Sequence, residues 1–166
     1  MAKIIRRIIS VLFGNYPQDD GTVKPIEWQV LKQEGNKALL ISKLGLEERR
    51  FDEKTNVWAD SEIRHWLNNE FLNSAFTEGE KVAILETELQ DEETTDKVFL
   101  LSREEAKTLF KCDEERRLNV WWWLRSPGDE THDAADVNFN GSVYCGGFGV
   151  NFRFNAVRPV IVLRLS

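Results

Sequence analysis

Short apolar runs near the N-terminus predict β-strands. Residues 8–13, 26–31 and 37–42 are β-prone runs, each bounded by polar or turn-forming residues. Residues 33–36, Gln-Glu-Gly-Asn, separate the second run from the third and are typical of a hairpin turn. We therefore expect a first strand followed by a β-hairpin.

Helical spacing replaces this pattern in the middle of the chain. Asp60 or Ser61 can cap a helix. Its apolar face would be formed by Ile63, Trp66, Leu67, Phe71 and Leu72. Two capping-box pairs predict further short helices: Thr77 with Glu80, and Ser102 with Glu105. Between them we expect a solvated acidic loop at residues 89–96 and a short apolar strand at residues 97–101.

The character of the sequence changes after Arg117. Helix formers give way to glycine, asparagine, valine and aromatic residues. Asn140-Gly141 predicts a type I′ hairpin turn, and residues 157–165 form an apolar strand that closes the chain. Helices first and a turn-rich antiparallel meander last indicate a single α+β domain, residues 1–166, and argue against a doubly wound sheet.

Charge and chain length narrow the possible partners. The 166 residues carry a net charge of −6 and show no basic face, so we expect no nucleic-acid partner. The apolar run after Lys3, Arg6 and Arg7 is too short for a signal peptide or a membrane span. We therefore expect no signal peptide, synthesis in the cytoplasm and no membrane insertion.

Catalytic motifs are scarce. The sequence has no phosphate-binding loop, no His-Glu-x-x-His and no Cys-x-x-Cys, and residues 146–149 lie between predicted strands, which is the wrong context for a dinucleotide site. Cys112 and Cys145 are expected to be free thiols, Cys112 structural and Cys145 in an exposed turn. His65 fits a helix surface, and His132 fits a polar loop better than a metal site. We expect no catalytic residue, metal or cofactor.

Three consecutive tryptophans, residues 121–123, have two interpretations. They could form a stacking platform for sugars or bases, or alternate across a strand with at least one face in the core. The core interpretation is favoured. Arg125 and Arg158 border apolar strands and are expected to be buried structural cations.

Several segments recur in order in one known family. They are residues 13–18 (FGNYPQ), 26–31 (IEWQVL), 38–42 (ALLIS), 63–68 (IRHWLN), 98–102 (VFLLS), 122–128 (WWLRSPG), 134–135 (AA), 141–143 (GSV) and 157–159 (VRP). On these segments the chain resembles a bacterial and phage domain family of unassigned function with a C-type-lectin-like fold. That family is related to the variable proteins of diversity-generating retroelements and to the formylglycine-generating enzymes.

The resemblance implies a C-type-lectin-like fold, with two or three short helices on antiparallel sheets and a C-terminal β-meander. It also implies a non-enzymatic protein that displays variable side chains to a protein or cell-surface ligand. Adenine-directed diversification cannot create Lys, Glu, Gln, Met or Trp, and residues 131–166 contain none of these five. The contact positions implied between the fixed motifs are Asp129, His132, Asp133, Asp136, Asn138, Phe139, Asn140, Tyr144, Cys145, Phe148, Phe152, Arg153, Phe154 and Asn155.

Two other functions stay open. The formylglycine-generating enzymes use a pair of cysteines, and Cys145 would be the reactive thiol here, without an obvious second member. Alternatively, the C-terminal meander could be the interface of an oligomeric assembly module. The calcium-binding motifs of sugar-binding C-type lectins are missing from the sequence, so we expect binding that does not depend on calcium.

Overall fold

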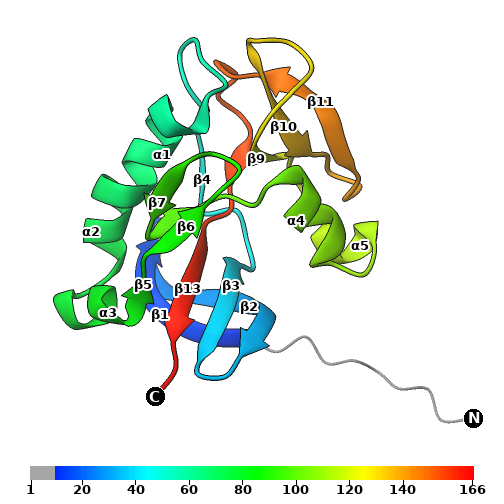
Figure 1. Cartoon of the computed structure of the whole chain (residues 1–166). Coiled ribbons are helices and arrows are strands. Elements are labelled where there is room, and N and C mark those ends of the chain that lie inside the picture. The colour runs from blue at the N-terminus through cyan, green and yellow to red at the C-terminus, as the bar shows by residue number, and fades with distance from the viewer. Residues whose placement is uncertain (1–9) are drawn as a thin grey trace, which may run out of the picture.

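Six strands pair into the first sheet of the computed structural model, which describes residues 10–166 (Figure 1). Its members are β1 (Ser10–Pro17), β2 (Val23–Glu34), β3 (Lys37–Ser42), β5 (Ile84–Leu85), β8 (Val98–Phe99) and β13 (Val160–Arg164). The order is β1-β2-β3-β13-β5, with β8 also on β13, and all pairs are antiparallel. The last strand of the chain therefore returns to the sheet of the first strands.

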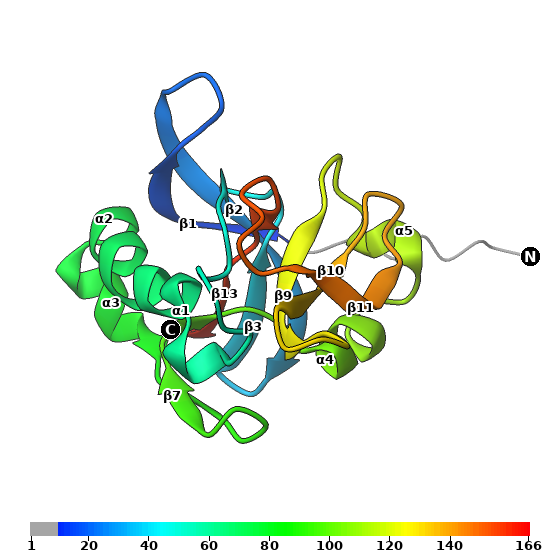
Figure 2. The same cartoon turned by 90° about the horizontal axis from the view of Figure 1, so that it is seen from above.

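A second sheet is built almost entirely from the C-terminal third. Its order is β11 (Val143–Gly149), β10 (Asp133–Val137), β9 (Trp122–Pro127), β12 (Ala156–Val157) and β4 (Glu47–Glu48). The consecutive strands β9, β10 and β11 form an antiparallel meander, whereas β12 runs parallel to β9. Figure 2 shows β10 and β11 on one side of the molecule, away from the β1–β2 hairpin.

Short helices flank the two sheets. Beside the first sheet lie α1 (Glu62–Trp66), a π-helical turn (Leu67–Phe71), α2 (Leu72–Ala75) and α3 (Glu78–Ala83). Near the second sheet lie α4 (Arg103–Thr108) and α5 (Asp113–Arg116). Within residues 10–166, no helix combines the length and the apolar character needed to cross a membrane. The protein is thus a mixed α+β structure in which sheets dominate.

Local sequence signals located several elements correctly. The hairpin of β2 and β3 is present, and Gly35 takes a positive φ of 58° at its turn. Ser61 caps α1, and both predicted capping boxes, at Thr77 and Ser102, are formed. The predicted first strand is confirmed from Ser10 onward and continues to Pro17, while its residues 8 and 9 lie outside the described part.

Two predictions about local structure are wrong. Residues 89–96 are largely a β-hairpin, β6 (Thr87–Leu89) with β7 (Thr94–Asp96), and this hairpin is held by the buried Asp96 carboxylate. Asp96 accepts hydrogen bonds from Trp58 Nε1 at 3.0 Å and Arg64 Nε at 2.8 Å. The turn before β11 is not type I′, because that turn needs a positive φ at Asn140, and only Gly141 has one.

Candidate binding surface

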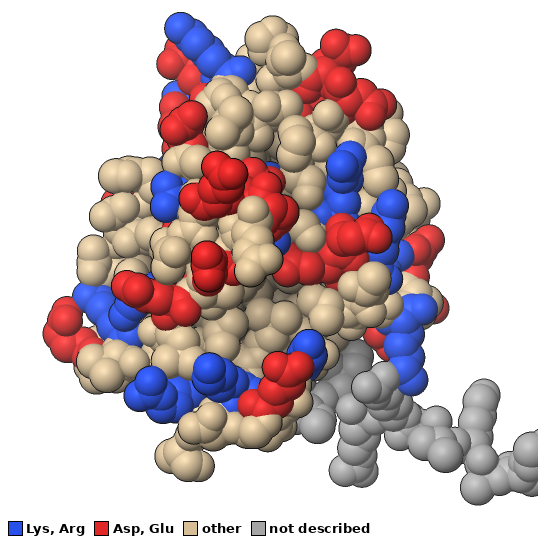
Figure 3. Space-filling view, viewed as in Figure 1, with Lys and Arg blue, Asp and Glu red and all other residues tan. Residues whose placement is uncertain are grey.

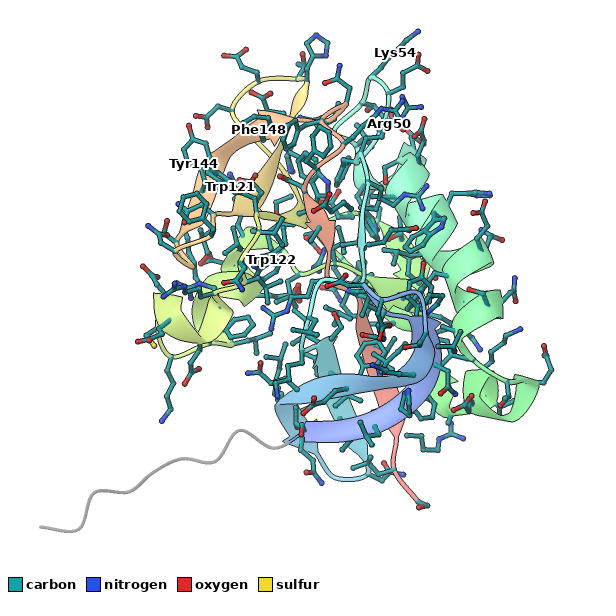
Figure 4. All side chains as sticks on the ribbon, turned by 180° about the vertical axis from the view of Figure 1, so that it is seen from behind. Arg50, Lys54, Trp121, Trp122, Tyr144 and Phe148 are labelled. Carbon is teal, nitrogen blue, oxygen red and sulfur yellow. The ribbon has the colours of Figure 1, made fainter. Side chains whose placement is uncertain are left out.

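Six aromatic side chains form a continuous surface over β10 and β11, which we call the aromatic face. Its members are Trp121, Phe139, Tyr144, Phe148, Phe152 and Phe154. Trp121 lies 6.0–6.3 Å, between ring centroids, from Phe139, Tyr144 and Phe148. Phe148 then contacts Phe152 at 4.4 Å, and Phe152 contacts Phe154 at 5.5 Å. Figure 4 shows Trp121, Tyr144 and Phe148 lying together over these strands.

Most of these rings are open to solvent. Phe139, Tyr144, Phe148 and Phe154 expose 59, 49, 41 and 64% of their surface, and Trp121 and Phe152 are half-buried. Five of the six were predicted as contact positions from the sequence. Monomeric proteins rarely leave a contiguous apolar patch of this kind uncovered.

The hairpin that carries Phe139 is fixed to α5. Gly141 has a φ of 91°, and a Cβ atom at this position would lie 1.7 Å from the carbonyl oxygen of Asp113. Arg116 Nε donates to the carbonyl oxygen of Gly141 at 2.8 Å. Asn138 and Asn140 use their side-chain oxygens to accept from backbone N–H groups of this turn. These two predicted contact residues therefore shape the turn on which Phe139 is displayed.

The segment that carries Phe152 and Phe154 is anchored at both ends. The carbonyl oxygen of Val150 accepts from the backbone N–H groups of Phe51 and Asp52, and that of Asn155 accepts from Arg49. Backbone contacts therefore hold both ends of the segment in place. Arg153 is exposed between the two phenylalanines.

The prediction that Asp136 and Asn155 are contact residues is wrong. Both are buried, with 0% and 1% of their surface exposed, and cannot contribute to a surface. Asn155 Nδ2 donates to Asp136 Oδ2 at 2.9 Å, while Asp136 Oδ1 accepts no hydrogen bond from the described residues. Burial raises the pKa of Asp136 to about 6, although the hydrogen bond from Asn155 opposes this shift. The pair ties the segment after Phe154 to β10.

The tryptophan run is divided between core and surface. Trp122 and Trp123 are fully buried, on opposite sides of β9: Trp122 packs on Phe110 and Trp123 on Phe51. The favoured interpretation, with at least one face of the run in the core, is confirmed by Trp122 and Trp123, whereas Trp121 precedes the strand and joins the aromatic face. The sequence signal that could have found Trp121 is its position just before the strand begins.

The two predicted structural cations are buried as expected. Arg125 pairs with Asp91 and Glu105 and donates to the carbonyl oxygen of Leu100 at 2.8 Å. Arg158 donates to three backbone carbonyl oxygens, those of Ser42, Lys43 and Arg116, and lies 4.9 Å above the Trp122 ring. Burial lowers the pKa of Arg158 to about 9. Both residues therefore connect segments that are far apart in the sequence.

The remaining predicted contact residues lie around the aromatic face. Asp129 and His132 are exposed in the β9–β10 loop, and Asp133 is half-buried at the start of β10. His132 Nδ1 lies 3.3 Å from the carbonyl oxygen of Lys54. Among residues 10–166, no three His, Cys, Asp or Glu side chains are grouped so that they could hold a metal ion.

The cysteines differ from their predicted environments. Cys145 lies within β11 and is half-buried, whereas an exposed turn was predicted. Cys112 is exposed, so the expectation that it is structural is wrong. Both thiols are free, and the structure contains no disulfide between them.

Two hollows lie away from the aromatic face. One, of about 430 Å³, is lined by the β6–β7 hairpin and by Arg125, whose charge is already paired with Asp91 and Glu105. Acidic side chains gather over this hairpin in Figure 3. The other, of about 590 Å³, lies beside α1 and includes His65 and Arg64, the latter paired with Asp96.

Comparison with known proteins gives one match. A family model described as a domain of unknown function (DUF6273) matches residues 35–165, which include both sheets except β1 and β2. No curated protein and no solved structure matches the chain. The matched segment contains the whole aromatic face.

Proposed function

The chain belongs to the DUF6273 family, and we propose that it is a non-enzymatic binding protein that recognises a protein ligand through its aromatic face. The observation that carries this proposal is the exposure of four large aromatic side chains in one contiguous cluster. Rigid aromatic side chains are the residues that contribute most binding energy at protein interfaces and in evolved paratopes.

The ring orientations favour a protein over a sugar or a nucleic acid. Trp121 meets Tyr144 at 83° and Phe139 at 71°, and Phe152 meets Phe154 at 69°. Sugars and bases stack on flat ring faces, which such nearly perpendicular rings do not offer as a platform. An uneven surface of ring edges and faces suits a partner with a complementary apolar groove.

We also propose a C-type-lectin-like fold for this chain. Short helices beside antiparallel sheets, together with the β9–β11 meander, support that assignment. The last strand, β13, lies in the sheet of β1–β3, and the meander forms a sheet of its own.

The aromatic face is further proposed to be the diversified surface of a retroelement variable protein. Five of its six residues lie within residues 131–166, which lack Lys, Glu, Gln, Met and Trp. The recurrent motif residues Ala134, Ala135, Val157 and Arg158 are buried, whereas four of the five intervening aromatic residues are exposed. A neighbouring reverse transcriptase gene with a near-copy of the coding segment for residues 122–160 would support this assignment, and a genome that encodes no reverse transcriptase would contradict it.

The binding function is tested with a quadruple variant in which Tyr144, Phe148, Phe152 and Phe154 are replaced by alanine. Immobilised wild type and variant are exposed to the same cell extract, and a protein retained by the wild type alone is purified for affinity measurement. We expect its Kd to rise at least about 100-fold in the variant, because several aromatic anchors are lost together.

The matched control replaces two exposed apolar residues elsewhere, Leu12 and Val82, by alanine. This control should bind as the wild type does, and the thermal midpoint of the quadruple variant should stay within a few degrees of the wild type. Unfolding of the quadruple variant, or equal loss of binding in the control, would contradict a role for the aromatic face. Light scattering of the purified wild type separates this function from self-association, which would give a stable oligomer without any ligand.

A further inference from the structure

Carboxylates without counter-ions lie next to one end of the aromatic face. The β9–β10 loop carries the exposed Asp129 and Glu130, and β10 begins at the half-buried Asp133. None of the three is within 4.0 Å of a basic side chain in the described part of the chain. The basic residues Arg50 and Lys54 lie on the other side of Phe148 from Tyr144 (Figure 4).

One of these carboxylates converges with Tyr144 above a glycine. A Cβ atom placed on Gly146 would lie 3.3 Å from Asp129 Oδ2 and 3.3 Å from both Cζ and the hydroxyl oxygen of Tyr144. The backbone N–H of Asp129 donates to the carbonyl oxygen of Gly146 at 3.0 Å, which fixes the loop against β11. Since glycine has no side chain, residue 146 leaves the space between the Asp129 carboxylate and the Tyr144 hydroxyl unfilled. We call the group of Asp129, Tyr144 and Gly146 the acidic corner.

A second, buried carboxylate lies beside the acidic corner. Asp136 is in register with Tyr144 on β11 and with Trp123 on β9, so these side chains share one face of the sheet. Asp136 has 0% of its surface exposed, and its Oδ1 has no hydrogen-bond donor among residues 10–166. A buried acceptor left in this state is rare, and the negative charge of this carboxylate favours a positive charge at the neighbouring surface.

We propose that the acidic corner receives a basic side chain, lysine or arginine, of the partner protein. This inference rests on the proposed function and names the chemistry of the ligand at one end of the same surface. A cation there interacts with the ring face of Tyr144 and forms a charge-assisted hydrogen bond to Asp129. The net charge of −6 also favours the approach of a cationic surface. The opposite end of the aromatic face carries the exposed Arg153 beside Phe152 and Phe154. The apolar part of the partner would bind at that end.

Two blocked amino acids of nearly equal size test the proposal. Nα-acetyl-lysine N-methylamide carries the charge, and Nα-acetyl-norleucine N-methylamide lacks it. Each is titrated into ¹⁵N-labelled protein, and the resonances of the Trp121 indole and of the Tyr144 and Gly146 amides are followed by NMR. The lysine compound should cause saturable shifts at these three groups, and the norleucine compound should bind at least about five-fold more weakly.

Two variants locate the effect. Asp129→Asn should weaken binding of the lysine compound at least about five-fold, since it removes the charge and keeps the shape. Asp19→Asn, at an exposed aspartate in the β1–β2 turn, is the matched control and should leave the titration unchanged. The spectra of both variants also report whether the fold is retained.

Equal binding of the two compounds, no saturable shift, or an Asp129→Asn titration identical to that of the wild type would overturn the proposal. These outcomes are distinct from failure of the proposed function. A purified ligand lost by the quadruple alanine variant but unaffected by Asp129→Asn would retain the aromatic face as a binding surface and reject the basic anchor. A ligand unaffected by the quadruple variant would reject the function itself.

Discussion

Two aromatic clusters of this protein have similar internal geometry and opposite exposure. In the first, beside α1 and α2, Phe71 contacts Tyr16, Trp66 and Phe76 with ring centroids 5.3–5.8 Å apart. In the aromatic face the corresponding separations are 4.4–6.3 Å. Phe71 is fully buried, whereas Phe154 of the aromatic face has 64% of its surface exposed.

The difference comes from what lies over each cluster. Helices α1 and α2 lie beside the first sheet (Figure 1). Trp66, Phe71 and Phe76 belong to the buried core, and Tyr16 packs against it. Over β10 and β11 four of the six rings stay exposed, although four of the five residues of β10 are buried. Contacts between rings therefore do not distinguish a buried core from an exposed surface. What distinguishes them is whether helices or strands pack over the rings.

The largest expected effect contrasts one phenylalanine from each cluster. Phe71→Ala should lower the free energy of unfolding by about 3–5 kcal/mol, because it opens a cavity in a closed core. Phe154→Ala should change it by less than about 0.5 kcal/mol, because the ring is mostly in water already. Urea unfolding of the two variants measures both values. Similar losses in the two variants would show that the aromatic face is part of the structural core.

A smaller effect should come from the carboxylate under the aromatic face. The pKa of Asp136 is raised from 3.8 to about 6 in the folded protein, so the folded state binds the proton more tightly than the unfolded state. The free energy of unfolding should therefore fall by about 3 kcal/mol as the pH rises from about 4 to above 6.

Asp136→Asn removes this titration and keeps the hydrogen bond from Asn155 within reach. Unfolding in urea at pH 4.5 and pH 7 should show the wild type losing more stability than the variant over this interval. Parallel pH profiles of the two proteins would mean that Asp136 is not held in a buried, undersolvated state. Its hydrogen-bond partner Asn155 and its register partner Tyr144 are unchanged in this comparison.

The smallest of the stability effects concerns the support of Phe139. Gly141→Ala should cost about 2 kcal/mol, because alanine is strained at a φ of 91° and its Cβ would overlap the Asp113 carbonyl oxygen. The NMR resonances of Phe139 and Trp121 should shift as well, since the hairpin must move away from α5. Gly21→Ala, with a similar φ of 79° and open space around it, is the matched control for the backbone strain alone. Equal effects of the two substitutions would argue against a fixed hairpin.

Elements specified by neighbouring residues could be predicted from the sequence. The capping boxes at Thr77 and Ser102 and the β2–β3 turn depend on residues within three positions of one another. The β6–β7 hairpin could not be predicted in this way. Its acidic sequence resembles a loop, and it is fixed by contacts of Asp96 with Trp58 and Arg64, more than thirty residues away.

The candidate site was predicted only in part, because it too depends on contacts between residues that are far apart in the sequence. Alternation along β10 fails because the pairing is irregular between Ala134 and Asp136, and four successive residues are buried. Asp136 and Asn155 were assigned to the surface because nothing in the local sequence shows that the segment around Phe152 and Phe154 covers them. The sequence also left open which of the three tryptophans reaches the surface, because this depends on where β9 begins, which is at Trp122.

Calorimetry of the captured ligand with the wild type, the quadruple alanine variant and the Leu12/Val82 control tests the central claim most directly. Burial of the aromatic face predicts a negative heat-capacity change of binding for the wild type and the control. It also predicts at least about 100-fold weaker binding by the quadruple variant, with its thermal midpoint nearly unchanged. Binding of the quadruple variant with the affinity and heat-capacity change of the wild type would contradict the assignment of the aromatic face as the ligand-binding surface.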